Sequence, residues 1–331
     1  MAGLGNVLVI NSGSSSVKYR FYEGEKAVID GTLDLFKEDI DYSKATEIIL
    51  KKLKNKKIDK IAHRVVYSGQ YTNHVVITDS VIKNLKQTFD LDPMHMPAAV
   101  ALIELFSKLN VKQIACFDTV FHETMPPVAK YYAIPWKLTQ KYDIKRYGFH
   151  GLSHQFLMQQ GRKFGSKIIT CHLGNGISLC AIKDGECIDT SMGFTPLEGI
   201  MMGTRSGSID PSLVAFISKK EKISADKVVE ILNKESGLKG IAGDADVRNL
   251  LKRKDVSAKL ALDMLCYQIR KQIGAYTMAL DGLDVIVFGG GISNSKEFIK
   301  RIMQNECMKD IKSVVVNTDE EKIMYEISQT L

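Results

Sequence analysis

The strongest constraint on the fold is an internal repeat. Residues 7–31 read VLVINSGSSSVKYRFYEGEKAVIDG, and residues 168–192 read IITCHLGNGISLCAIKDGECIDTSM. Each copy contains an apolar strand, a polar turn with glycine, a second strand, a charged glycine turn and a third strand. Gly13 and Gly174 occupy equivalent positions in the two copies. The repeat predicts two related domains, with a chance likeness of two hairpins as the alternative.

The segments that follow each copy have a mixed α/β pattern. Helical periodicity is expected in five segments: Lys44–Asn55, Val81–Asp90, Pro97–Leu109, Ala225–Lys234 and Ser257–Leu280. Continuous apolar runs, typical of strands covered by helices on both faces, occur in three: Lys60–Ala62, Gln113–Phe117 and Asp284–Phe288. We therefore expect two α/β domains with a cleft between them, where ligand sites are common.

Composition excludes several classes of protein. With 331 residues, 45% of them hydrophobic and 25% charged, the chain is neither disordered nor fibrous. A net charge of +7 suits an anionic ligand but is too diffuse to indicate nucleic acid binding. No run approaches the roughly 18 apolar residues of a membrane helix. The six cysteines form no CxxC pair, so we expect reduced thiols and a cytoplasmic location.

Three glycine-containing turns follow apolar strands. The first is Asn11–Lys18, the second is His172–Gly176, and the third, Phe288–Asn294, leads into a helix near Ser295. Small residues let backbone N–H groups approach phosphate oxygens, and a helix N-terminus favours anions. Each turn alone could be only a turn, but the first two repeat one design and predict a two-sided phosphate site.

Cationic side chains stand near other strand ends and turns. Arg64 ends an apolar strand, and Arg205 lies in the glycine-rich turn MGTRSG. No Ser–His or Cys–His pairing suggests covalent catalysis, and no histidine spacing suggests zinc. Glycine turns, arginines, histidines and a few carboxylates suit Mg²⁺-assisted phosphoryl transfer. A carboxylate acceptor would already be ionised at neutral pH and would need no general base.

Taken together, these motifs resemble those of the acetate kinase family, within the acetate/sugar kinase–Hsp70–actin superfamily. The matching stretches follow family order along most of the chain: Asn11–Lys18, His63–Val66, Met94–Pro97, Phe117–Pro126, Arg146–His154, His172–Ser178, Gly193–Pro211, Ser236–Leu250, Phe288–Asn294 and Asp319–Glu321. The resemblance implies an α/β fold of two duplicated RNase H-like domains, each a mixed sheet flanked by helices, with an interdomain cleft. Residues 1–119 with 320–331 would form the N-terminal domain, and residues 120–319 the nucleotide-binding and dimerisation domain.

The resemblance also implies roles for individual residues. Catalysis would use Arg205 and His150 on the transferring phosphoryl group, with Asp118 orienting an active-site arginine. Arg64 would bind the substrate carboxylate, and the acyl methyl would meet Val66, Met94, Phe149 and Pro196. Asn11 and Glu320 would hold Mg²⁺ or Mn²⁺, and His95 and His172 would line the phosphate path. ATP or ADP would contact Lys18, His172, Leu173, Gly174, Asn175, Gly176, Asp246, Val247, Arg248, Gly290, Gly291, Ile292, Ser293 and Asn294.

The implied reaction is ATP + acetate ⇌ ADP + acetyl phosphate, catalysed by a homodimer without nucleic acid or membrane partners. Arg64 and Val66, two apart on one expected strand, would share a face and place the methyl on Val66. Ser293 and Asn294 stand where the family usually has Gly-Glu. A pyrophosphate-dependent acetate kinase therefore remains an alternative, and a propionate kinase is a second one. A nucleotide-driven conformational switch is another, but it would have no use for Arg64.

Overall fold

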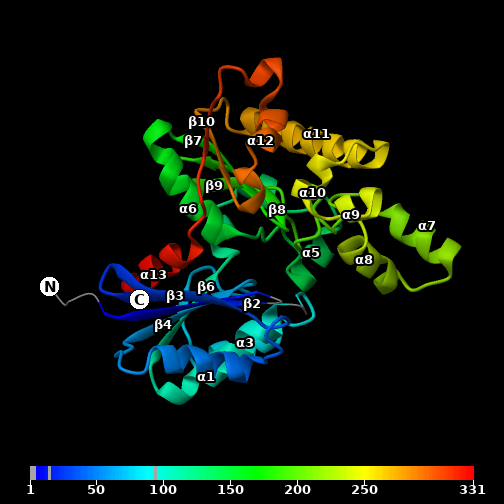
Figure 1. The fold of residues 1–331 in the computed structure, drawn as a ribbon. Coiled ribbons are helices and arrows are strands. Elements are labelled where there is room, and N and C mark those ends of the chain that lie inside the picture. Colours follow the sequence, from blue (N-terminus) through cyan, green and yellow to red (C-terminus); the bar gives the residue numbers. More distant parts are fainter. Residues whose placement is uncertain (1–4, 14–15, 93–94) are drawn as a thin grey trace. The chain divides into compact units, whose positions relative to one another are not determined.

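The computed structural model describes residues 5–13, 16–92 and 95–331. The chain divides into two compact units (Figure 1). Unit 1 contains residues 1–121 and 319–331, and unit 2 contains residues 122–318. Among the helices in the described ranges, none combines the length and the apolar character needed to cross a bilayer.

Unit 1 is built on a six-stranded mixed sheet in the order β3-β2-β1-β4-β6-β5. Its strands are β1 (Val7–Ser12), β2 (Ser16–Glu23), β3 (Lys26–Asp34), β4 (Lys60–Val65), β5 (Val75–Val76) and β6 (Lys112–Phe117). Strands β1, β4 and β6 run parallel, whereas β2 and β3 form an antiparallel meander on β1. The carboxyl ends of the three parallel strands therefore meet at one edge of the sheet.

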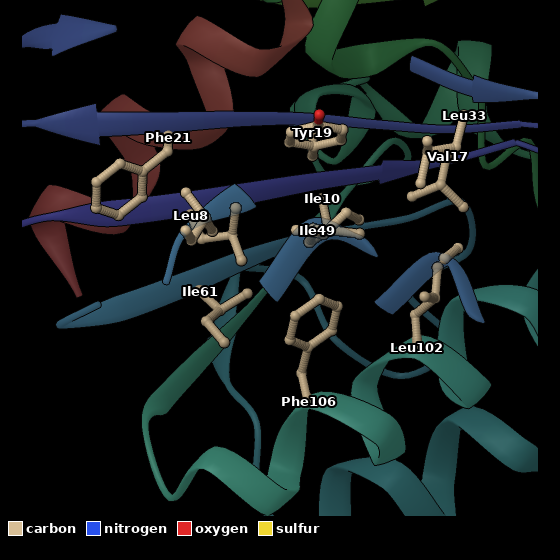
Figure 2. Packing of buried hydrophobic residues seen from close by; sticks show 12 residues of the cluster. Leu8, Ile10, Val17, Tyr19, Phe21, Leu33, Ile49, Ile61, Leu102 and Phe106 are labelled. Carbon is tan, nitrogen blue, oxygen red and sulfur yellow. The ribbon is translucent and has the colours of Figure 1, made fainter. Parts of the chain in front are cut away.

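Helices cover both faces of this sheet. They are α1 (Tyr42–Lys52), α2 (Asp79–Lys86), α3 (Met96–Phe106) and α13 (Glu320–Thr330). Figure 1 shows α1 and α3 on one face and α13 on the other. The core beneath α1 and α3 joins apolar side chains of β1 and β2 to Ile49 and Phe106, all nearly inaccessible to solvent (Figure 2). Burial on both faces explains why β1 is apolar through four successive residues.

Unit 2 repeats the architecture with a five-stranded sheet in the order β11-β10-β7-β8-β9. The strands are β7 (Lys167–Leu173), β8 (Ile177–Lys183), β9 (Glu186–Thr190), β10 (Val285–Gly289) and β11 (Lys312–Val315). The helices are α4 (Pro127–Lys130), α5 (Trp136–Tyr142), α6 (Gly151–Gly161), α7 (Ser212–Glu221), α8 (Ala225–Lys234), α9 (Gly237–Ala242), α10 (Val247–Lys252), α11 (Val256–Ala279) and α12 (Lys296–Met303). Short 3₁₀ turns in the chain lie at Ser107–Leu109, Val120–His122, Arg162–Phe164, Gly291–Asn294 and Glu306–Met308.

The two sheets confirm the repeat expected from the sequence. The order β3-β2-β1-β4-β6 corresponds strand for strand and direction for direction to β9-β8-β7-β10-β11. Asn11 pairs with Lys18 in the first copy, and His172 pairs with Ser178 in the second. Both meanders even shift register at equivalent places, after Phe21 and after Ala181. The five expected helices and three expected strands are present, with ends within a few residues of the expected ones.

One expectation about strand geometry is wrong. Strand β4 ends at Val65, so Val66 lies just beyond it and the alternation of side chains does not place Val66 on the face of Arg64. Val66 is nevertheless buried, at 6% exposure, in the turn that follows the strand. Strand β5 has no counterpart in unit 2 and pairs antiparallel with β6.

Candidate active site

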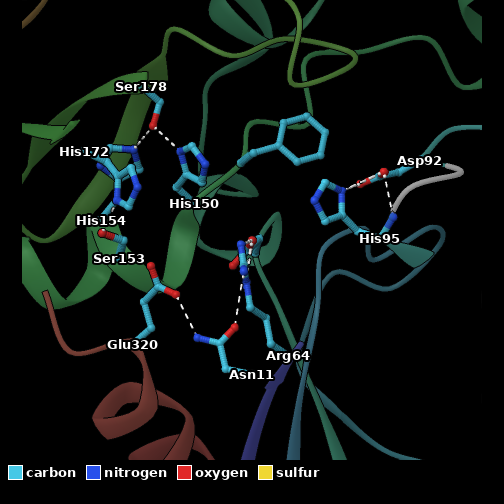
Figure 3. Close-up of polar contacts among 12 residues, drawn as sticks. Asn11, Arg64, Asp92, His95, His150, Ser153, His154, His172, Ser178 and Glu320 are labelled. Atoms are coloured by element: carbon cyan, nitrogen blue, oxygen red, sulfur yellow. Dashed lines mark hydrogen bonds and ion pairs between the residues drawn. The ribbon is translucent and has the colours of Figure 1, made fainter. Parts of the chain in front are cut away.

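In unit 1, polar side chains gather where the parallel strands end. Asn11 lies near the end of β1, Arg64 near the end of β4, and Asp118 directly after β6. The topology places these three residues side by side, because β4 lies between β1 and β6. Arg64 links the other two, since it donates from Nη1 to Asn11 Oδ1 over 3.3 Å and from Nη2 to Asp118 Oδ2 over 2.6 Å (Figure 3).

The Arg64–Asp118 ion pair is largely removed from water. The side chain of Arg64 is 16% exposed and that of Asp118 only 1%. A second bond, from Arg64 Nε over 3.1 Å, makes the contact to Asp118 two-pronged and fixes the guanidinium plane. Burial opposes the charge on Arg64, but Asp118 and the glutamates of α13 outweigh it and raise its pKa. The arginine is therefore a permanent cation at the end of an apolar strand.

Two carboxylates at the start of α13 face Asn11. The amide Nδ2 of Asn11 donates to Glu320 Oε2 over 3.2 Å and to Glu321 Oε1 over 2.8 Å. An ion pair of 2.6 Å between Arg20 and Asp319, the N-cap of α13, fixes where the helix begins. One or two carboxylates together with amide oxygens and substrate phosphates are the usual surroundings of Mg²⁺. The residues present thus fit a Mg²⁺ ion that also takes ligands from outside the protein.

The remaining expected residues of unit 1 lie in different settings. Lys18, opposite Asn11 on β2, is exposed. His95, at the N-terminus of α3, contacts the Asp92 carboxylate through Nδ1 at 2.9 Å. Met94 lies outside the described residues.

In unit 2, the turn after β7 converges with a histidine and an arginine. A Cβ atom built on Gly176 would lie 2.9 Å from His150 Cε1 and 3.4 Å from Arg205 Nη1. Any larger residue would therefore collide with His150, which explains the glycine. The His172 ring stacks on His150 with a centroid distance of 4.2 Å. A glycine turn, two imidazoles and a guanidinium thus share one small region.

Hydroxyl groups hold the rings of His150 and His154 in place. Ser178 Oγ lies 2.8 Å from both His150 Nδ1 and His154 Nε2 (Figure 3). Thr170 Oγ1 lies 2.7 Å from His154 Nδ1. Burial lowers the pKa of His154 well below its usual value, so this ring is neutral. Ser178 has one proton to donate, so it donates to one ring and accepts from the other. The chain of bonds fixes the orientation of His150.

The backbone around Arg205 is anchored by α9. The N–H groups of Ser236 and Leu238 donate to the carbonyls of Thr204 and Met202, each over 2.9 Å. Arg205 in turn accepts at its carbonyl from Met202 N over 2.9 Å, and its Nη1 lies 3.4 Å from the Pro196 carbonyl. The arginine therefore projects from a closed turn rather than from a flexible loop.

The third glycine turn lies beside the second. Gly290 has φ of +86°, and a Cβ there would lie 2.5 Å from the Leu173 carbonyl oxygen, so only glycine fits. Residues Gly291–Asn294 then form a 3₁₀ turn in which Ser293 Oγ donates to the Gly290 carbonyl. The structure thus brings turns 172–176 and 290–294 together, and the second of them leads directly into α12.

The other expected residues of unit 2 differ in exposure. Asp246 caps α10 and pairs with Arg248, whose side chain is 75% exposed. Val247 is buried at 1% exposure. Phe149 is buried and Pro196 half-buried.

Sequence reasoning missed several residues of these clusters. Glu321 contacts Asn11 more closely than Glu320 does, and it stood within the matched stretch Asp319–Glu321. Ser178 stood within the matched stretch His172–Ser178, but only the register of β7 against β8 shows that Ser178 and Thr170 orient histidines from neighbouring strands. Arg146 pairs with Glu198 over 2.9 Å and ties the turn before His150 to the turn before Arg205.

A model of the acetokinase family matches residues 35–329. The chain belongs to the acetokinase family. It is 42% identical to the acetate kinase of Thermoanaerobacterium thermosaccharolyticum over 88% of this chain and 85% of that protein. It is 40% identical to the acetate kinase of Carboxydothermus hydrogenoformans over 96% and 89% of the two chains.

Solved structures of the acetokinase family agree in fold. A propionate kinase from Francisella tularensis superposes with a TM-score of 0.91 at 33% identity, covering 99% of this chain and 100% of its own. An acetate kinase from Porphyromonas gingivalis superposes with a TM-score of 0.87 at 32% identity, covering 98% and 99%. The expected α/β fold with duplicated RNase H-like sheets is thereby confirmed.

Proposed function

We propose that this chain is an acetate kinase that transfers the γ-phosphoryl group of ATP to acetate and releases ADP and acetyl phosphate. The acetate kinases to which it is similar support this activity. The observation that carries the proposal is the convergence of the Gly176 turn with His150 and Arg205. A backbone turn that approaches phosphate, flanked by a guanidinium and an oriented imidazole, suits a phosphoryl group in transit.

In this proposal, Arg64 binds the acetate carboxylate. Acetate is ionised at neutral pH, so its oxygen attacks the γ-phosphorus directly while the bond to the bridging oxygen of ADP breaks. Asp118 orients the guanidinium through its two bonds to Arg64. The same arrangement serves the reverse reaction, in which acetate leaves as an anion.

Arg205 and His150 act on the phosphoryl group. Its equatorial oxygens carry most of the charge in a loose transition state, so donors placed there lower the barrier. The hydrogen bond between Ser178 Oγ and Nδ1 keeps the His150 ring oriented, and this ring would contact a phosphoryl oxygen. The anchored turn holds Arg205 ready before substrate binds, which avoids reorganisation during the reaction.

Asn11 and Glu320, with Glu321 beside them, would hold Mg²⁺ or Mn²⁺. The bound ion would neutralise charge on the nucleotide phosphates. ATP itself would contact Lys18, turn 172–176, turn 290–294 and residues 246–248. The acyl methyl would meet Val66, Met94, Phe149 and Pro196.

We further propose a cytoplasmic homodimer formed through unit 2, with this unit also binding the nucleotide. Leu260, Met264 and Tyr267 of α11 are exposed, at 50%, 38% and 61%, and their spacing places them on one face of the helix. An apolar helix face open to water is typical of an interface. All six cysteines are free thiols, which suits a reducing compartment.

The experiment that tests the function traps the acyl phosphate as a hydroxamate. Full-length protein is supplied with Mg²⁺, acetate or propionate as acceptor, and ATP or pyrophosphate as donor. We expect the highest kcat/KM with ATP and acetate. A clear preference for pyrophosphate, or for propionate, would replace the proposed donor or acceptor, and no hydroxamate with any pair would refute the kinase.

A further inference from the structure

Unit 2 contains a cluster of soft ligand atoms that the proposed reaction does not use. Cys180 on β8, Cys187 on β9 and His122 before α4 each have 0% exposure. His122 Nδ1 lies 3.2 Å from Cys187 Sγ and 4.0 Å from Cys180 Sγ, and the two sulfurs are 3.3 Å apart. Three potential metal ligands from separate segments thus face one point.

The orientation of His122 is set by its other nitrogen. Nε2 lies 3.0 Å from the backbone carbonyl of Phe149, and a carbonyl can only accept, so Nε2 carries the proton. In the neutral ring, Nδ1 therefore presents its lone pair to the sulfurs. Histidines that bind metals are usually oriented in this way by a hydrogen bond from the second nitrogen. The His122 ring also packs closely on Gly148, because a Cβ at that position would lie 2.6 Å from the ring.

The spacing of the three atoms matches three of the four corners of a tetrahedral zinc site. Zn–S bonds of about 2.3 Å and Zn–N bonds of about 2.0 Å separate neighbouring ligands by roughly 3.5 to 3.8 Å. The observed separations of 3.2, 3.3 and 4.0 Å bracket that range, so small side-chain shifts suffice. Two thiolates would balance the charge of a divalent ion, and the neutral imidazole adds none, so the filled site is neutral and can be buried.

We propose that His122, Cys180 and Cys187 bind a soft divalent metal ion of the Zn²⁺ type. Binding releases the two thiol protons to solvent and forms two metal–sulfur bonds and one metal–nitrogen bond. The ion would fasten the β8–β9 hairpin to His122 and, through Nε2, to the Phe149 carbonyl. It would therefore stabilise the backbone next to His150 without touching substrate.

The test uses Co²⁺ as a spectroscopic probe on reduced, chelator-treated full-length protein. Wild type should take up about one equivalent with thiolate-to-cobalt charge-transfer bands in the near ultraviolet, and Zn²⁺ should displace it. Cys180→Ala and Cys187→Ala should each weaken binding by at least tenfold. Cys266→Ala, a buried cysteine of α11, is the matched control and should bind as wild type does. Circular dichroism melting without metal checks that each variant folds.

A measurement on wild type alone guards against variants that fail to fold. X-ray absorption of the zinc-loaded protein should show two sulfur neighbours at about 2.3 Å and a nitrogen at about 2.0 Å. A shell of oxygen and nitrogen only would place the ion elsewhere and overturn the proposal. Absence of thiolate bands, bands that persist in both cysteine variants, or a Cys180–Cys187 disulfide that forms in place of metal uptake would do the same.

Discussion

Arg64 donates hydrogen bonds to Asn11 and Asp118 in unit 1, and in the proposed function it also binds the acetate carboxylate. Arg64→Ala should raise the KM for acetate by more than tenfold and also lower kcat, because the guanidinium contacts the carboxylate before and during transfer. Arg64→Lys should recover only part of the loss, since an ammonium cannot make the two-pronged contact to Asp118. Steady-state kinetics with varied acetate give both constants.

Removing Arg64 also leaves Asp118 buried without its ion-pair partner, which can destabilise unit 1. Asp118→Asn is the control for this loss of stability, because it removes the negative charge of the Asp118 side chain and keeps its size. Melting curves of both variants separate lost stability from lost binding. An acetate KM within twofold of wild type in folded Arg64→Ala would place the carboxylate elsewhere.

Ser178 tests whether the orientation of His150 matters. Ser178→Ala removes the hydroxyl shared by His150 and His154, and it should lower kcat by about tenfold with little change in the KM for acetate. Thr170→Ala should lower kcat less, because Thr170 contacts His154 and lies one hydrogen bond further from His150. Equal effects of the two variants, or an unchanged kcat in Ser178→Ala, would show that this network does not position His150.

Val66 tests the proposed acyl pocket. Val66→Ala should raise kcat/KM for propionate relative to acetate by about tenfold, within the 1–3 kcal/mol that one methylene usually provides. Val65→Ala is the matched control, since Val65 is buried inside β4 and should affect stability without changing the ratio. A wild type that already prefers propionate, or a ratio unmoved by Val66→Ala, would mean that the methyl lies elsewhere.

At this scale, the sequence indicated which residues belong to the candidate site better than it indicated which residues they contact. Arg64 lies near the end of an apolar strand and Arg205 lies in a glycine-rich turn, and both are local patterns. The contact of Asn11 with Glu321 joins residues 310 positions apart, and no local pattern encodes it. The Cys180–Cys187–His122 cluster was invisible for the same reason, because strand register and not sequence spacing brings it together.

At the scale of elements, the strand alternation and the glycine turns sufficed to predict the two meanders. The end of β4 could not be read from sequence, because the apolar run continues through Val66 and Tyr67, and both remain buried after the strand ends. The two-residue strand β5 is too short to show an alternation of apolar and polar residues. Its pairing with β6 depends on the tertiary fold and not on a local pattern.

The packing of α3 on β4 and β6 depends on a buried histidine. His63 Nε2 lies 2.6 Å from Gln113 Oε1, and Gln113 donates to the Ile103 carbonyl at the end of α3. Burial lowers the pKa of His63 to about 4. His74, which accepts from Phe117 N over 3.1 Å, is likewise lowered by burial, to a pKa of about 4.

These two histidines predict acid sensitivity of unit 1. Between pH 6.5 and about 4 the unfolded chain binds protons that the folded unit excludes, so the free energy of unfolding falls as pH falls through this window. His63→Gln should remove the part of this fall in the free energy of unfolding that comes from His63, which is on the order of 3 kcal/mol across the window. Hydrogen exchange of the β4 amides is the suitable measurement, because the single tryptophan, Trp136, reports on unit 2.

Above pH 7 neither histidine titrates, so His63→Gln and wild type should show parallel pH dependence there, which serves as the internal control. The same acid dependence in His63→Gln as in wild type, between pH 6.5 and 4, would contradict the assignment of this effect to His63.

At the scale of the whole molecule, the proposed function assigns different parts of the chemistry to the two units. Unit 1 carries the proposed carboxylate and metal ligands, Arg64, Asn11 and Glu320. Unit 2 carries the glycine turns with His150 and Arg205. The two meanders are equivalent in strand order and direction, and in the proposed function residues at their ends serve different parts of one reaction.

The central claim is that Arg205 stabilises the phosphoryl group in transit while Arg64 holds the carboxylate. The most direct measurement is kcat and the KM for acetate in Arg205→Ala, with Arg301→Ala, a half-buried ion-paired arginine of α12, as control. Because the contact of Arg205 strengthens in the transition state, kcat should fall about a hundredfold or more while the KM changes little. A kcat equal to that of the control, in a variant that folds as wild type does, would contradict the account.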